Sequence, residues 1–386
     1  MSEKDLDNKS KITFIKLKKT DAQYFIQFVK NNFKFDSVID NKYKSEHIEN
    51  DIIFPLVENK KIIDKLVKTM ENLISFDFVS KRGEINPNFK YKTLREALRG
   101  NIPTQYLNII PKSYDIIGNI AILEFEKPDQ VNNSKYNEIK DIVAKAVIDV
   151  NKSVLSVFEK KSQIKGSYRL RDLAYLGGEN NSITVHKENN CVFHLDIKTT
   201  YFSPRLVYER RRISESNIQK DEVIVDMFSG VGTFSIQIAK LNPVLIHAFD
   251  LNLAAYKFLK RNIDSNKLKG KVFPYNMNIR DLINPSNQTG RMLYNNTDRI
   301  IMNLPENSIN FIDVACFLMK KSGGILHFYQ FSEKPYAIEK TIEALNKKLN
   351  EFNWTINNIF DSKIVKSYSP KAELVVVDLY IKNLHS

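Results

Sequence analysis

The sequence predicts an α/β protein whose last domain is a mostly parallel sheet covered by helices on both faces. An α+β middle domain and a small amino-terminal domain precede it. After Pro204, short β-rich runs alternate with helical patterns, as parallel strands joined by helical crossovers do. Between Tyr114 and Ile197, β-rich runs flank one long amphipathic helix. We therefore expect domains at 1–110, 111–196 and 197–386.

Composition supports a folded, basic protein. The chain has 386 residues, enough for two or three domains, and 42% hydrophobic with 27% charged residues excludes a disordered chain. The net charge of +13 favours a polyanionic partner, because each neutralised phosphate releases counterions, although a lysine-rich surface also serves solubility.

Several classes of protein are not expected. Two cysteines exclude a disulfide scaffold, and Cys191-x-x-His194 has no second pair nearby, so we expect no metal. No apolar run reaches the roughly 18 residues of a membrane span. The amino terminus resembles neither a secretory signal nor a transit peptide. We expect a cytoplasmic monomer without membrane contact, leave the nucleus open as a second location, and disfavour mitochondria.

The elements are expected in this order. Residues 12–110 read as mixed and mainly helical, with Ile62, Leu66 and Met70 at helical spacing. A helix with Ile139 and Val143 on its apolar stripe follows the first β-rich run of the middle domain. Runs 182–187 and 191–197 form a hairpin. Six further strands are expected at EVIVDMF, VLIHAFD, KVFPY, RIIMNL, GILHFYQF and ELVVVDLYI.

The carboxyl ends of these last strands are the expected site, because open α/β sheets bind ligands there. Asp226 ends the first strand, and Gly230 and Gly232 let the backbone turn and approach a ligand. Ser235 stands where a dinucleotide motif has its third glycine, which weakens that interpretation. A structural turn and a ligand-binding turn both remain open.

Polar residues follow the next strands. Asp250 is placed to accept both hydroxyls of a ribose, or to cap the following helix. Asn278 and Ile279 are placed to hold an adenine, although Asn278 also suits a plain turn. Asn303-Leu304-Pro305 offers an amide on a backbone fixed by proline, to hold an amine or a ring edge, unless it too is only a turn.

Arginines gather before this domain. Residues 201–212 carry four arginines around Glu209, which indicates either a solvated charged helix or an RNA-facing cleft. Arg169 and Arg171 form a second basic element suited to a phosphate or a guanine edge.

Seven ordered motifs resemble the archaeal and eukaryotic tRNA (guanine(37)-N1)-methyltransferase family. They are YDIIGNIAILEF, GSYRLRDLAYLGG, TVHKENNCVFHLD, TYFSPRLVYERRRIS, DMFSGVGTFS, FDLN and MNLPE. The resemblance implies a Rossmann-type methyltransferase domain, S-adenosylmethionine as methyl donor, the tRNA anticodon loop with guanosine 37 as substrate, and an amino-terminal domain that docks on tRNA.

The resemblance also implies residue roles. Glu209 falls on the general base, Arg169 on the guanine-holding arginine, and Asn303 with Pro305 on the catalytic turn. Donor-binding positions fall on Tyr201, Arg212, Asp226, Gly230, Gly232, Asp250, Leu251, Asn278, Ile279 and Asn303. Two residues depart from the family: Thr233 replaces a usual proline and Asn278 a usual aspartate.

The chemistry of guanine agrees with these roles. N1 carries a proton at neutral pH, so methyl transfer needs a base, and Glu209 would need a pKa near the working pH. Arg169 would stabilise charge on O6, and Asn303 would hold the exocyclic amine and so reject adenine. An aminocarboxypropyl transferase of wybutosine synthesis is the first alternative, disfavoured by Leu304-Pro305 because that family resembles NLG there. A non-catalytic RNA-binding protein is the second.

Overall fold

The computed structural model describes residues 11–98, 101–126 and 131–385. Two compact units compose the chain, Met1–Ala97 and Leu98–Ser386. The first unit thus ends before the expected boundary at 110, because Leu98, Ile102 and Ile109 belong to the second unit and are buried. The expected boundary at 196 lies inside the second unit and stays a prediction.

The first unit is a four-stranded antiparallel sheet with helices, in the strand order β2-β3-β1-β4. The strands are β1 Lys11–Lys18, β2 Glu46–Ile48, β3 Asp51–Pro55 and β4 Phe76–Arg82. The helices are α1 Ala22–Asn32, α2 Phe35–Val38, α3 Lys60–Met70 and α4 Leu94–Ala97. Phe25, Val29, Leu66 and Met70 of α1 and α3 are buried in one apolar cluster with the sheet. The helical spacing of Ile62, Leu66 and Met70 corresponds to α3, whereas the four strands were not expected from the sequence.

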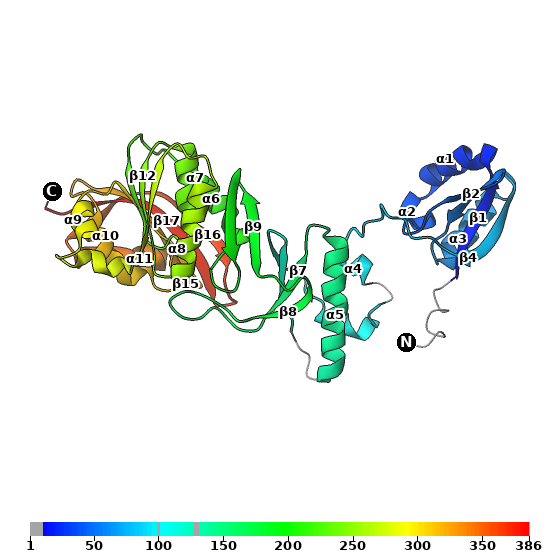
Figure 1. Cartoon of the computed structure of the whole chain (residues 1–386), viewed down its shortest axis with the longest axis horizontal. Coiled ribbons are helices and arrows are strands. Elements are labelled where there is room, and N and C mark those ends of the chain that lie inside the picture. The colour runs from blue at the N-terminus through cyan, green and yellow to red at the C-terminus, as the bar shows by residue number, and fades with distance from the viewer. Residues whose placement is uncertain (1–10, 99–100, 127–130, 386) are drawn as a thin grey trace. The chain divides into compact units, whose positions relative to one another are not determined.

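The second unit begins with a four-stranded sheet in the order β5-β6-β7-β8 and one helix beside it (Figure 1). Its elements are η3 Thr104–Ile109, β5 Asp115–Ile117, β6 Ile120–Leu123, α5 Asn133–Val150, β7 Ser156–Lys160 and β8 Leu173–Gly178. Only β6 and β7 pair in parallel, as expected of two strands joined by α5. The expected hairpin is confirmed as β9 Ile183–Glu188 and β10 Cys191–Asp196, with Asn189 and Asn190 both at positive φ in its turn.

A seven-stranded sheet forms the rest of the unit, in the order β13-β12-β11-β14-β15-β17-β16. The first five strands in this order run parallel; β17 pairs antiparallel with β15 on one side and with β16 on the other, so β17 alone runs in the opposite direction. The strands are β11 Val223–Asp226, β12 Leu245–Asp250, β13 Lys271–Asn276, β14 Arg299–Met302, β15 Gly324–Glu333, β16 Trp354–Ser367 and β17 Ala372–Asn383. The Rossmann-type prediction is confirmed, and the strand order reverses between β11 and β14. Six strands were expected; β16 was not.

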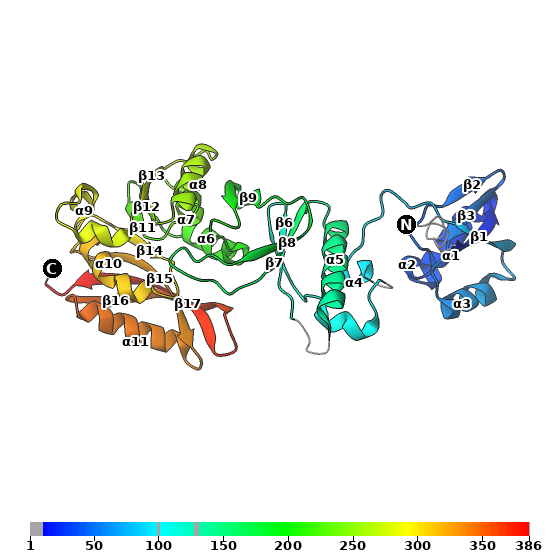
Figure 2. The ribbon, with the colours of Figure 1, turned by 60° about the horizontal axis from the view of Figure 1, so that its bottom comes forward.

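Helices cover both faces of this sheet (Figure 2). Helices α7 Thr233–Leu241 and α8 Leu253–Asp264 lie on one side, and α10 Ile312–Leu318 and α11 Ala337–Asn350 on the other. Neighbouring residues of β11 therefore serve different cores: Ile224 packs with the first pair of helices and Val225 with the second. The shorter elements are η4 Pro204–Leu206, α6 Val207–Ser214, η5 Ile279–Ile283, α9 Gln288–Leu293 and η6 Ser308–Phe311.

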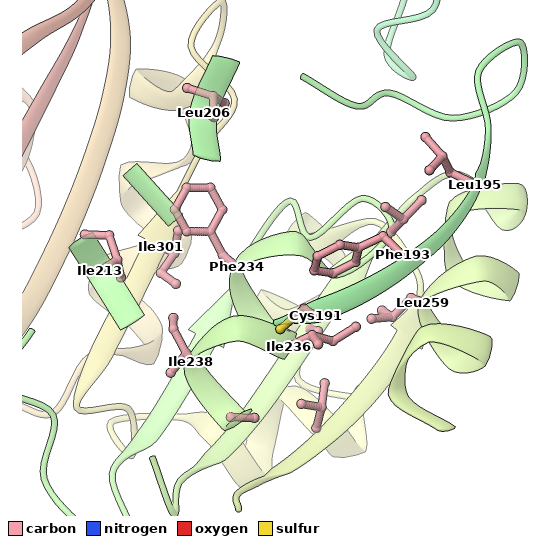
Figure 3. Packing of buried hydrophobic residues seen from close by; sticks show 14 of the residues in the cluster. Cys191, Phe193, Leu195, Leu206, Ile213, Phe234, Ile236, Ile238, Leu259 and Ile301 are labelled. Atoms are coloured by element: carbon pink, nitrogen blue, oxygen red, sulfur yellow. The ribbon is translucent and has the colours of Figure 1, made fainter. Parts of the chain in front are cut away.

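The hairpin packs into the core on the α7 and α8 side of the sheet. Cys191 and Phe193 of β10 lie among Ile236 and Leu259 in the same apolar cluster (Figure 3). Two asparagines, Asn262 of α8 and Asn266 just after it, bond the free edge of β10: Asn262 accepts from His194 N at 2.7 Å, and the side chain of Asn266 accepts from Val192 N at 3.0 Å. Both side-chain amides also donate to the carbonyl of the same β10 residue. The middle part of the chain is thereby held against the seven-stranded sheet.

In the part of the chain that the structure describes, no helix combines the length and apolar character needed to cross a membrane.

Candidate active site

The turn after β11 uses its two glycines differently. Gly232, at φ 90°, begins α7, and a Cβ there would lie 2.4 Å from Leu259 Cδ1, so this glycine is required by packing. Gly230, at φ 56°, would place a Cβ no closer than 3.8 Å to its nearest neighbour, Tyr201 O. Space therefore lies beside Gly230, where a ligand can approach the backbone.

Asp250 holds this turn rather than capping a helix. Its Oδ2 accepts from Gly230 N at 2.7 Å and its Oδ1 from Asn252 N at 2.8 Å. Asn252 is the residue that caps α8, by accepting from Ala254 N. Burial raises the pKa of the Asp250 carboxyl. The neighbouring Leu251 side chain, expected at the cofactor, is 45% exposed.

Asp226 is buried beneath the turn. The Ser235 hydroxyl donates to its Oδ2 at 2.7 Å, whereas its Oδ1 has no hydrogen-bond partner in the described chain. Burial raises the pKa of this carboxyl to about 7. Ser235, at the position of the missing third glycine, therefore anchors the strand end to α7.

Asn278 serves as a cap in the structure. Its side chain accepts from Arg280 N at 3.1 Å and begins η5, while Ile279 is buried in the core on the other face of the sheet. The turn alternative is therefore the one that the structure shows. A contact of these residues with adenine stays a prediction.

The turn after β14 is tightly held, and one polar atom in it lacks a partner. Ser308 accepts from Leu304 N and donates to Met302 O, both at 3.2 Å, and Phe331 N donates to Pro305 O at 2.9 Å. Asn303 Oδ1 is buried without a hydrogen bond in the described chain. Because an unpaired buried acceptor is costly, this atom favours a ligand that brings an N–H donor.

Arg169 joins this turn to the glycine turn. Its guanidinium lies over the Tyr201 ring, 4.4 Å from the centroid, and its Nη2 is 3.7 Å from Glu306 Oε1. Tyr201 is also the residue whose carbonyl borders Gly230. Arg169 is only 7% exposed, and its Nε has no hydrogen-bond partner in the residues described. The structure thus brings together residues that the sequence places far apart.

A basic cavity of about 270 Å³ opens beside Arg169. The cations that line it are Lys160, Arg169, Arg171, Arg205 and Lys366. Asp115 pairs with Lys160 at 3.5 Å and with Arg205 at 2.8 Å. Burial, followed by the charge of Arg205, lowers the pKa of Lys366. The surplus of positive charge suits a polyanion such as an RNA backbone.

Glu209 lies on α6, outside the residues that line this cavity. It is 5% exposed and contacts Arg212 Nη2 at 2.8 Å, Lys363 Nζ at 2.8 Å and the Tyr329 hydroxyl at 3.3 Å. Burial raises its pKa, but the hydrogen bonds and charges of Arg212 and Lys363 outweigh burial and leave the pKa below its usual value. The expected pKa near the working pH is therefore wrong, because the cations dominate.

Arg212 belongs to the same cluster. Its Nη1 bonds the Asp378 carboxylate and lies 3.5 Å from Asp361, while its Nε and Nη2 face Glu209. Its donors are taken up by carboxylates of the chain. Binding of the methyl donor by Arg212 stays a prediction.

The arginine-rich helix fits neither of its two interpretations well. Arg210 is 1% exposed and forms a two-point ion pair with Glu188 of β9, at 2.5 and 2.6 Å. Arg211 alone forms a surface pair, with Glu215. Most of this charge therefore fixes α6 against the hairpin and the sheet.

Strand β15 connects the two groups of residues. Phe331 bonds the Asn303–Pro305 turn, and Tyr329, two residues earlier and on the same face of the strand, bonds Glu209. Two residues span about 7 Å along a strand. The Glu209 cluster and the turn thus lie at neighbouring positions of one strand.

Several residues of these clusters were not found from sequence. Glu306 beside Arg169 ends the MNLPE motif but was assigned no role, and Ser308 in the turn lies outside every motif. The charged residues of the carboxyl-terminal strands were also missed: Lys363, Lys366 and Asp378. His327, which lies outside the sequence motifs, is 2% exposed.

No cluster of three His, Cys, Asp or Glu side chains suited to a metal occurs among residues 11–98, 101–126 and 131–385. Cys191 is buried among apolar side chains, which raises its pKa to about 11.

Comparisons with known proteins agree with this geometry. Residues 184–357 match the TRM5/TYW2 methyltransferase domain, and residues 94–181 match the TYW2 N-terminal domain. The tRNA (guanine(37)-N(1))-methyltransferase Trm5b of Methanocaldococcus jannaschii is 32% identical over 347 residues, 90% of this chain and 93% of that protein. A tRNA(Phe) (4-demethylwyosine(37)-C(7)) aminocarboxypropyltransferase of Pyrococcus horikoshii is 30% identical over 288 residues, 75% of this chain and 96% of that protein.

Two solved structures are also similar over nearly the whole chain. The complex of aTrm5 with tRNALeu matches with a TM-score of 0.70 and 30% identity, over 95% of this chain and 99% of the other. Methanocaldococcus jannaschii Trm5 in complex with adenosine matches with a TM-score of 0.58 and 28% identity, over 96% and 99%.

Proposed function

The chain belongs to the Trm5-type tRNA (guanine(37)-N(1))-methyltransferases of the TRM5/TYW2 methyltransferase family, and on that premise we propose how its residues methylate N1 of guanosine 37 in tRNA. The observation that carries the proposal is the meeting of Arg169, Tyr201 and the Asn303–Pro305 turn at the strand ends, beside a basic cavity. A guanine-holding arginine, a donor-site tyrosine and an amide with an unpaired oxygen are the groups that this reaction needs.

Residues at the strand ends fit S-adenosylmethionine, which supplies an electrophilic methyl group on sulfur when bound. The open space beside Gly230 admits a ligand to the backbone. Asp250, already fixed by two backbone N–H groups, would accept ribose hydroxyls there. Asn303 Oδ1 would accept an N–H from a bound molecule.

Guanine recognition is assigned to Arg169 and Asn303. Arg169 can leave its 3.7 Å contact with the half-exposed Glu306 and donate to O6, where negative charge develops as N1 loses its proton. Asn303 would accept from the exocyclic amine, which adenine does not carry at that position.

Glu209 is assigned as the general base. Its lowered pKa keeps the carboxylate ionised at neutral pH, so that it accepts the N1 proton, and the electron pair left on N1 forms the new bond to the methyl carbon as the carbon–sulfur bond breaks. Arg169 offsets the weakness of this base, because it stabilises the guanine anion that the proton leaves behind.

Transfer of labelled methyl from S-adenosylmethionine to unmodified tRNA tests the activity. We expect 1-methylguanosine in a tRNA with guanosine at position 37 and no label in the same tRNA with adenosine there. Nucleoside mass analysis separates the alternatives: an aminocarboxypropyl product on a wyosine-type precursor would support the transferase of wybutosine synthesis. Binding of donor and tRNA without any product would support an RNA-binding protein.

Replacement of the base has a matched control on the same helix. Glu209→Gln should bind donor and tRNA normally and lose at least 99% of methyl transfer, whereas Glu215→Gln, at the exposed end of α6, should keep it. Near-normal turnover of Glu209→Gln would remove this residue as the base.

A further inference from the structure

We propose that Asp378 and His327 are positioning residues for Glu209: acting through Arg212, they set where the Glu209 carboxylate lies and how much of the Arg212 charge it receives. The inference rests on the proposed role of Glu209 as base and adds two residues that the sequence motifs do not contain.

A continuous chain of polar contacts, buried except at the partly exposed Arg212, connects these residues. Arg212 bonds Glu209 on one side, at 2.8 Å, and the Asp378 carboxylate on the other. Asp378 Oδ1 lies 2.7 Å from His327 Nδ1, and His327 Nε2 lies 2.9 Å from Arg299 Nη1. The chain therefore crosses from α6 through β17 and β15 to β14.

The register of the sheet builds this arrangement. His327 of β15 is paired directly with Asp378 of β17, and Asp361 of β16 is paired with Asp378 on its other side. Directly opposed residues in a sheet stand close together, so three charged or polar side chains form one row across three strands. Arg212 lies against this row, bonded to Asp378 and 3.5 Å from Asp361.

The proton positions follow from the partners. Arginine only donates hydrogen bonds, so His327 Nε2 accepts from Arg299 and the ring proton resides on Nδ1, which donates to Asp378. The other end of the Arg299 guanidinium is held by Glu222, at 3.1 Å, and by Asn217 O, at 2.9 Å. Asp378 is thus held as a carboxylate in a single orientation. Burial raises the pKa of this carboxyl, but His327 and Arg212 lower it by more, so that it is about 2.

Arg212 divides its charge between two buried carboxylates. Glu209 also faces Lys363 of β16 and the Tyr329 hydroxyl of β15, and Lys363 lies 3.9 Å from Asp361. Without the charge of Asp378, the whole Arg212 cation would act on Glu209. The carboxylate would then be held more tightly and would be a weaker base.

The experiment compares Asp378→Asn with the wild-type enzyme in single-turnover methyl transfer between pH 4 and 9, at saturating donor and tRNA. We expect the rate at neutral pH to fall at least tenfold and the acid limb of the profile to move to lower pH, with both dissociation constants within twofold of wild type. Glu215→Gln is the matched control, because it removes a half-exposed carboxylate that pairs with Arg211 of the same helix, outside the contacts that reach Glu209; its rate should change less than twofold.

Asp378→Glu separates charge from position. It should leave the acid limb in place and recover part of the lost rate, and it serves as the test if Asp378→Asn does not fold. A profile of Asp378→Asn that superimposes on that of the wild type, or a wild-type rate in Asp378→Glu where the asparagine variant cannot be measured, would overturn the inference. Near-normal turnover of Glu209→Gln would instead contradict the proposed base itself, so the two failures are distinguishable.

Discussion

At the scale of single residues, buried carboxyl groups of the seven-stranded sheet have opposite electrostatic surroundings. Asp226 has a hydroxyl and backbone groups around it but no cation, and burial raises its pKa to about 7. Asp378 is also buried but lies between His327 and Arg212, and its pKa is about 2. Burial alone does not determine the charge of a side chain here; the presence of a cation does.

The raised pKa of Asp226 makes stability depend on pH. Its unfolded pKa is about 3.9, so the folded state binds one more proton than the unfolded state between about pH 4 and 7. The stability that the protonated carboxyl provides is full below pH 4, falls as the pH rises across this window, and is lost above the folded pKa of about 7. Asp226→Asn should remove the dependence. Urea unfolding should show that the free energy of unfolding of the variant, relative to that of the wild type, rises by about 2–3 kcal/mol between pH 5 and pH 8. An unchanged difference across this range would contradict the assignment.

Arg169 should matter for chemistry more than for binding. Arg169→Ala is expected to slow single-turnover methyl transfer about 100-fold, the usual effect of removing one oxyanion-type donor, with a small change in tRNA affinity. Arg171→Ala, in the same cavity, is the control and should weaken binding without slowing the chemical step. If Arg169→Ala loses affinity alone, Arg169 contacts phosphate and not O6.

Prediction of these residues from sequence succeeded where a motif follows a strand. Asp226, Gly230, Asp250 and Asn303 all lie at strand ends as expected. The residues that contact the site residues and shift their pKa values were not predicted, because a contact such as that of Glu209 with Lys363 joins residues more than 150 positions apart. Nothing in the local sequence of either residue indicates the other.

At the scale of elements, the hairpin of β16 and β17 is the part that sequence patterns identified least well. β17 is mostly buried and was expected as a strand, whereas β16 is largely half-buried or exposed and lacks the alternation that indicates a strand. This edge strand supplies Lys363 to the Glu209 cluster and Lys366 to the basic cavity. The polar sequence of β16 is the reason why the strand was not predicted, and it is also the source of the charged side chains that reach the two sites.

The attachment of β10 to α8 is expected to contribute strongly to stability. Asn262 is fully buried and bonds His194 N, His194 O and Val231 O. Asn262→Ala would leave these backbone groups unpaired, so the free energy of unfolding measured in urea should fall by about 2–4 kcal/mol. Asn266→Ala, which removes the equivalent bonds to Val192 nearer the surface, should cost less. Equal losses would show that burial does not set the difference.

At the scale of the whole molecule, the excess of positive charge should appear as a salt dependence of tRNA binding. The chain carries a net charge of +13, and five cations, Arg169 among them, line the basic cavity. Lys366→Gln should weaken binding of tRNA with guanosine or adenosine at position 37 to the same degree. The slope of log affinity against log salt should become shallower by about 0.7, the value for one contact to single-stranded RNA. A loss specific to tRNA with guanosine at position 37 would instead place Lys366 in contact with the guanine base.

The monomeric state and the cytoplasmic or nuclear location stay predictions.

The spacing of two residues on β15 limits which changes of sequence an enzyme of this kind can tolerate. Tyr329 bonds Glu209, and Phe331, two residues later on the same face of the strand, bonds the Asn303–Pro305 turn. A single inserted residue between them would turn one side chain to the opposite face of the sheet. The loops beyond the strand ends can lengthen or change to suit different RNA partners, while the spacing of the reacting groups, carried by the strand, stays the same.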